Sequence, residues 1–116
     1  MMKVLNFYTT DHQGHLLCRK KNCTIRLGDK SAKYAEGDVV WITAGKRFAP
    51  RKLLFTAVLD RVFVKPLSSV SEEDLRGESP DFQNLGDLLS HLRDIYKKEP
   101  KGDEIVTVIY FSEILE

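Results

Sequence analysis

Alternation of apolar and polar residues predicts strands along most of the chain. Segment 23–27 alternates around β-branched Thr24 and Ile25, which is typical of a half-buried strand. Alternation predicts further strands at 3–8 and 53–64, and two β-branched and aromatic runs predict strands at 39–43, after the turn at 36–38, and at 104–111. Segment 53–64 exceeds the usual strand length, so we expect a bend or a bulge within it.

A different periodicity predicts helices. Apolar residues recur at three- and four-residue steps after Asn84, which is suited to capping a helix; the stripe is Leu85, Leu88, Leu89, Leu92 and Tyr96. Ser69 or Ser71 precedes three acidic residues at 72–74, which favour the positive end of a second, shorter helix. A third, short helix is predicted within 10–17, although Gly14 weakens it. Together, these elements predict a compact α+β domain.

The size of the chain fits a single domain over residues 1–116. A chain of this length buries roughly two thirds of its unfolded surface, so we expect it to fold without disulfides, metal or cofactor. The net charge of +1 excludes a uniformly basic nucleic-acid coat, but local basic patches remain compatible with it. No secretory signal pattern and no membrane-length apolar run is present, so we expect a soluble, cytoplasmic protein.

Two histidines and two cysteines raise the question of a metal site. His12, His15, Cys18 and Cys23 have a spacing that could suit zinc. Residues at three-residue intervals drift around a helix, however, and Cys23 would have to fold back. We therefore interpret the cysteines as reduced thiols and the histidines as solvated side chains.

Segment 19–26 carries the most chemistry. It places four cations at the entry to a strand, and two of them, Lys21 and Arg26, flank the hydroxyl of Thr24. Crowded cations disfavour one another's protonation, and a neutral lysine beside a threonine forms a base and nucleophile pair. Arginine is suited to an oxyanion or phosphate. On spacing alone, a basic run before a strand is more typical of a solvated face.

An ordered set of motifs resembles the ASCH domain family of the PUA-like superfamily. The resemblance covers residues 3–114. Its elements are Lys21-x-x-Thr24-x-Arg26, Tyr34-x-x-Gly37-Asp38-x-Val40, a long strand ending near Val64, Asp74-Leu75-Arg76-Gly77-Glu78, and Asp94-Ile95-Tyr96. It implies a PUA-like β-barrel of about five to six mostly antiparallel strands with two to three flanking helices.

The family signature Gly-x-Lys-x-x-Glu-x-Arg has its lysine and arginine at Lys21 and Arg26, with Thr24 at the glutamate position and Arg19 at the glycine position. The threonine is similar to that of the small bacterial N4-acetylcytidine amidohydrolases, in which a lysine, a threonine and a distant glutamate form the catalytic set. The resemblance implies Lys21 as base and Thr24 as nucleophile. Glu78 matches the distant glutamate, and Asp81 competes for that position.

The implied function is amide hydrolysis on a modified nucleoside, and the alternative is a non-catalytic RNA-binding module. Candidate substrate contacts are Arg26, Arg19, Lys20, Lys46 and Arg47, with an aromatic wall from Tyr8, Trp41 or Phe55. Trp41 is more typical of a core or barrel wall. RNA binding would use the same cations together with Arg51 and Lys52. The sequence does not decide whether the ligand is a nucleoside or an intact RNA, and it does not give the oligomeric state.

Overall fold

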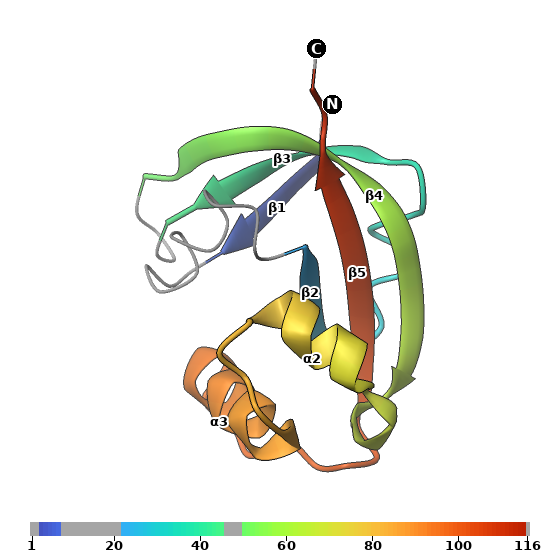
Figure 1. The fold of residues 1–116 in the computed structure, drawn as a ribbon, viewed down its shortest axis with the longest axis vertical. Coiled ribbons are helices and arrows are strands. Elements are labelled where there is room, and N and C mark those ends of the chain that lie inside the picture. Colours follow the sequence, from blue (N-terminus) through green and yellow to red (C-terminus); the bar gives the residue numbers. More distant parts are fainter. Residues whose placement is uncertain (1–2, 8–21, 46–49, 116) are drawn as a thin grey trace.

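The structure, a computed structural model, describes residues 3–7, 22–45 and 50–115 of the chain. One curled sheet contains five strands in the order β1-β3-β4-β5-β2 (Figure 1). They are β1 (Lys3–Phe7), β2 (Cys23–Leu27), β3 (Val39–Ala44), β4 (Lys52–Pro66) and β5 (Ile105–Glu113). All neighbouring strands are antiparallel except β1 and β3, which are parallel. The sheet forms a half-barrel with β1 and β2 as its edges.

The curl depends on β4, which is 15 residues long. This strand pairs with β3 through its first half and with β5 through its second half. The register against β5 shifts between Leu59 and Arg61, so the predicted bulge is confirmed. A bulge increases the local twist of a strand, and β4 bends as a long arc across both halves of the sheet (Figure 1).

Two helices cover one end of the half-barrel. Helix α2 (Glu72–Glu78) begins at Ser71, whose side chain accepts a hydrogen bond from Asp74 N in a capping box. Helix α3 (Leu85–Tyr96) begins at Asn84, whose side chain accepts from Asp87 N. Both predicted helices are confirmed, with Ser71 rather than Ser69 as the cap, and a short 3-10 helix, η1 (Leu67–Ser69), precedes α2. The helix predicted within 10–17 lies outside the described residues.

Buried apolar residues form two clusters, one in the half-barrel and one beneath the helices. Phe55 belongs to the half-barrel cluster, whereas Leu88 and Leu92 of the predicted stripe belong to the helical cluster and are fully buried. Trp41 is not a core residue, because Val40 and Ile42 point inward and leave it on the outer face, 42% exposed. Across the described residues, no helix is long and apolar enough to cross a membrane.

Candidate functional site

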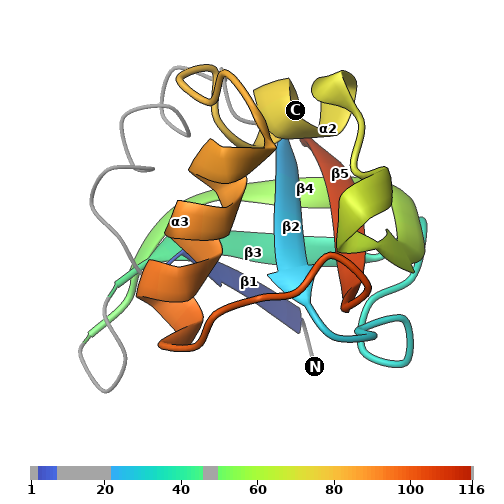
Figure 2. The same cartoon turned by 90° about the horizontal axis from the view of Figure 1, so that it is seen from below.

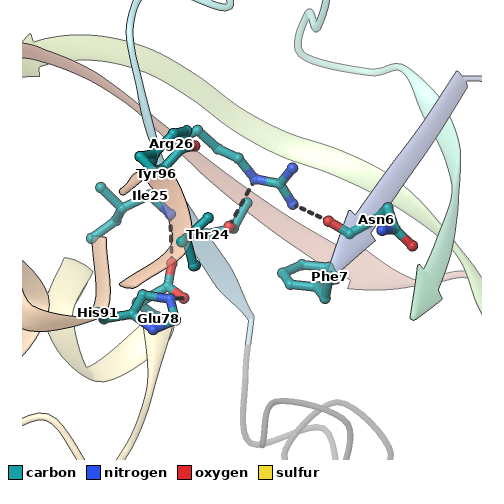
Figure 3. A pocket seen from close by; sticks show the side chains of 9 residues that line it. Asn6, Phe7, Thr24, Ile25, Arg26, Glu78, His91 and Tyr96 are labelled. Carbon is teal, nitrogen blue, oxygen red and sulfur yellow. Dashed lines mark hydrogen bonds and ion pairs between the residues drawn. The ribbon is translucent and has the colours of Figure 1, made fainter. Parts of the chain in front are cut away.

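A pocket opens where the two edge strands of the half-barrel meet the helices (Figure 3). We call it the Thr24 pocket, and it is lined by Asn6, Phe7, Thr24, Ile25, Arg26, Glu78, His91, Ile95 and Tyr96. Helix α3 runs alongside β2 at this place (Figure 2). The pocket contains about 380 Å³ of empty space, its mouth included.

Thr24 lies inside the protein rather than on a solvated face. It is only 3% exposed, so the interpretation from spacing alone is wrong for this residue. Its Oγ1 atom accepts a hydrogen bond from Arg26 Nε over 3.2 Å. Since the oxygen accepts from the guanidinium, the hydroxyl's own hydrogen must point elsewhere. The threonine is therefore oriented to donate or to attack on the side away from Arg26.

Arg26 connects the two edges of the open sheet. Its Nη2 atom donates to the backbone oxygen of Asn6 over 2.9 Å, from β2 across to β1. Its guanidinium also lies over the ring of Phe7, with 5.1 Å from Cζ to the ring centroid. These contacts use two of its nitrogens to hold the pocket wall and Thr24 in place (Figure 3).

Glu78 enters the same pocket from the last residue of α2. Its side chain is 2% exposed, and its Oε2 atom accepts a hydrogen bond from Ile25 N over 2.6 Å. Its other oxygen, Oε1, lies 3.7 Å from His91 Nε2. A carboxylate at a helix C-terminus is disfavoured by the helix dipole. The contacts with β2 and with His91 offset that cost.

Gly77 explains how the glutamate reaches β2. A Cβ atom at this position would lie 2.7 Å from both Asn22 Oδ1 and Cys23 Cβ. Asn22 N also donates to the Gly77 oxygen over 3.2 Å. Only glycine permits this close approach of helix to strand, and the approach places Glu78 beneath the Ile25 amide.

Three other polar residues of the pocket were not predicted from the sequence as site residues. Asn6 Oδ1 accepts from Thr43 Oγ1 over 2.7 Å, and the Tyr96 hydroxyl accepts from Leu27 N over 3.2 Å. The His91 ring packs at 60° against Phe82, with 5.5 Å between centroids. A histidine beside a leucine stripe or an asparagine in a strand has no local signal that separates it from ordinary surface residues.

The predicted site residues therefore divide into three groups. Thr24, Arg26 and Glu78 line one pocket, whereas Trp41 lies on the outer face of the sheet. Asp81 is exposed and lines a separate depression with Asp87 and Asp94, so of the two candidate acids Glu78 lines the pocket of Thr24 and Asp81 does not. The remaining predicted residues lie outside the described residues; they are Arg19, Lys20, Lys21, Lys46 and Arg47.

The residues whose spacing could suit zinc lie only in part within the described residues. His12, His15 and Cys18 lie outside them, as does the aromatic candidate Tyr8, while Cys23 is buried. Within residues 3–7, 22–45 and 50–115, no group of three or more His, Cys, Asp or Glu side chains is arranged to hold a metal ion.

A second buried carboxylate occupies the other end of α2. Asp74 accepts hydrogen bonds from Lys65 Nζ over 2.6 Å, from the Tyr110 hydroxyl and from Ser71 N over 3.1 Å. Burial raises the pKa of Asp74, but the hydrogen bonds from Lys65, Tyr110 and Ser71 outweigh burial and hold it below its usual value. Burial and the bond to Asp74 raise the pKa of Tyr110. This cluster is closed by protein groups and stabilises α2.

No model of a known protein family matches the sequence, and no curated protein matches it. The fold, in contrast, is similar to several solved structures. The ASCH domain from Lactobacillus crispatus JV V101 superposes with a TM-score of 0.67 at 13% identity, over 96% of this chain and 79% of that one. The hypothetical protein PH0355 gives 0.69 at 15%, over 98% and 100%.

Protein EF3133 from Enterococcus faecalis V583, attributed to the family DUF984, also superposes with a TM-score of 0.69, at 13% identity, over 98% of this chain and 81% of that one. Identities this low establish the architecture and not the chemistry. The chain therefore has an α+β, ASCH/PUA-like fold: a curled, mixed five-stranded half-barrel with two helices.

Proposed function

We propose that this ASCH-fold protein hydrolyses an amide on a modified nucleoside, with N4-acetylcytidine as the expected substrate. The observation that carries the proposal is the meeting of Thr24 and Glu78 at one pocket, although they lie on different elements and far apart in the sequence. A buried hydroxyl and a buried carboxylate around one cavity form a nucleophile and an acid–base group. The motif resemblance supplies the substrate class.

The reaction divides into acylation and deacylation. Lys21 takes the hydroxyl proton of Thr24 while Oγ1 attacks the acetyl carbonyl carbon. The carbon–N4 bond then breaks, and the exocyclic amine of cytidine leaves with the proton that Lys21 took, which produces an acetyl ester on Thr24. Glu78 takes a proton from water, and this water attacks the ester. Acetate departs, and Thr24 regains its proton.

Arg26 supports this chemistry from the wall of the pocket. Its Nε–H already donates to Thr24 Oγ1, so it stabilises negative charge as that charge develops on the oxygen. The Phe7 ring beneath the guanidinium and the side chain of Ile95 provide apolar surface for a pyrimidine. Phe7 thus replaces Trp41 and Phe55 as the aromatic candidate among the described residues.

The Glu78 end of the pocket favours a neutral group over a phosphate. A carboxylate repels phosphate groups, and Glu78 is nearly buried there, where the repulsion is screened least. The exocyclic nitrogen of cytosine, in contrast, is a hydrogen-bond donor that a carboxylate accepts. This end of the pocket therefore suits the exocyclic group of a base, while Arg26, which lines the same pocket, balances the charge of Glu78.

The proposal is tested by incubating the protein with N4-acetylcytidine and following the release of cytidine and acetate by chromatography. We expect turnover by the wild type, loss in Thr24→Ala and Lys21→Ala, and partial retention in Thr24→Ser. Thr56→Ala is the matched control, because Thr56 lies on β4 outside the pocket. Absence of release by the wild type between pH 5 and pH 9 would overturn the proposed reaction.

RNA is the alternative ligand. Exposed Arg51 and Lys52, where β4 begins, are cations suited to phosphate contacts. If the substrate is an intact RNA, an acetylated oligonucleotide should be hydrolysed faster than the nucleoside, and this advantage should shrink steeply as salt is raised. Salt-dependent RNA binding without release of acetate would support the non-catalytic module instead.

A further inference from the structure

His91 and Glu78 form a close pair inside the Thr24 pocket. His91 Nε2 lies 3.7 Å from Glu78 Oε1, and the two side chains are 16% and 2% exposed. Glu78 Oε2 accepts the hydrogen bond from Ile25 N. The other carboxylate oxygen, Oε1, is therefore the one that faces His91. Figure 3 shows the imidazole and the carboxylate at the same end of the pocket.

The surroundings of His91 are mostly acidic. Glu78 faces it from α2, and Asp81, from the connection between the helices, lines the outer depression that His91 also lines. Asp87 and Asp94, on α3 itself, line the same depression. On the pocket side, Arg26 is the one cationic group among the described lining residues. The carboxylate of Glu78, 3.7 Å from the imidazole, favours its protonated form.

We propose that His91 is a positioning residue of this site, which in its protonated form holds Glu78 as an oriented carboxylate and so sets the pH range in which Glu78 acts. The effect on catalysis rests on the proposed function. The imidazolium places its charge 3.7 Å from Glu78 Oε1, which favours ionised Glu78. When His91 loses its proton, this favourable charge disappears, and the two groups titrate as a coupled pair.

The coupling is measured without any substrate by nuclear magnetic resonance of the imidazole C–H groups. The signal that is missing from His91→Gln identifies His91 among the three histidines of the chain. We expect the titration midpoint of His91 to fall by about one pH unit in Glu78→Gln. The matched control Glu72→Gln, whose side chain is 83% exposed on the same helix, should leave the midpoint unchanged. An unchanged midpoint in folded Glu78→Gln overturns the proposal.

A second measurement covers the case in which Glu78→Gln does not fold. The proposal implies that ionised Glu78 favours protonated His91 in the folded protein, so the stabilising effect of the pair should be complete at low pH, where the unfolded imidazole is also protonated, and should disappear as the pH rises and His91 loses its proton. In urea unfolding, the stability advantage of the wild type over His91→Gln should therefore be larger at pH 5.5 than at pH 8.5. An equal advantage at both values overturns the coupling.

The catalytic consequence is tested by the pH profile of kcat/KM. In His91→Gln, the acidic limb should move to higher pH by about one unit, because ionised Glu78 loses its cationic neighbour. A purely structural role would lower activity at all pH values without moving the limb, and that result overturns the positioning role. A wild type without activity would instead count against the proposed function, and the resonance titration would still decide the coupling.

Discussion

The two ends of α2 hold two buried carboxylates that differ in almost every other respect. Asp74 and Glu78 are both 2% exposed and lie four residues apart on the same helix. Asp74 lies in the first turn, where the helix dipole favours an anion, and it contacts a lysine, a tyrosine and the capping serine. Glu78 lies at the opposite end, where the dipole disfavours it, and it lines a pocket.

The comparison shows that burial alone does not identify a functional acid. Asp74 is enclosed by groups that stabilise its charge, so it contributes to the fold and has no surface for a ligand. Glu78 contacts the Ile25 amide and His91 at the helix end that disfavours an anion, and it lines a pocket. A carboxylate that lines a cavity is more typical of function than one that is enclosed by protein groups.

The largest expected effect comes from Asp74→Ala. This substitution removes a capping residue and leaves the half-buried Lys65 without its carboxylate, so we expect a loss of about 4 kcal/mol in the free energy of unfolding. Urea denaturation followed by Trp41 fluorescence measures this loss. The control is Glu73→Ala, whose side chain is exposed on the same turn and should cost well under about 1 kcal/mol. Similar losses in both variants would contradict the structural role of Asp74.

Glu78→Gln should lose little stability but most of its hydrolytic activity. The amide still accepts from Ile25 N, so the loss of stability should stay near about 1 kcal/mol. Hydrolysis should fall by about 100-fold or more, because the amide cannot take a proton. Paired measurements of kcat/KM and urea midpoint separate the two effects. A variant that loses stability but keeps full activity would remove Glu78 from the reaction.

Gly77→Ala tests whether the close approach of α2 to β2 positions Glu78. Alanine favours the helix by about 1 kcal/mol, but the added Cβ would meet Asn22 and Cys23 at 2.7 Å, and such overpacking costs roughly 1–3 kcal/mol. We expect a small net destabilisation and a tenfold loss of hydrolysis, because α2 must move away from β2 and takes Glu78 with it. Arg76→Ala, at an exposed neighbouring position, should change neither quantity.

The smallest expected effect is the change in stability at acidic pH. The pKa of Asp74 is lower in the folded protein than in the unfolded chain, so its stabilisation is present above the unfolded value and is lost as the pH falls through the folded value. The stability advantage of the wild type over Asp74→Asn should therefore shrink below about pH 4. Urea midpoints between pH 7 and pH 3 measure it. A constant difference would show that the charge of Asp74 is not involved.

The sequence by itself determined the local elements. Alternation and β-branched runs located the five described strands, and Asn84 and a serine at 69 or 71 located both described helices, because strand patterns and capping depend on neighbouring residues. It also singled out Thr24, Arg26 and Glu78, which the structure brings to one pocket.

Tertiary structure decided what those residues contact. Only the curl of the sheet brings Asn6 and Phe7 of β1 to Arg26 of β2, and only the packing of α3 against α2 brings His91 to Glu78. It also placed Trp41 outside and Asp81 on the surface. These contacts join residues far apart in the chain, so no local spacing encodes them; they follow from the closure of the half-barrel and the burial of the two helices against it.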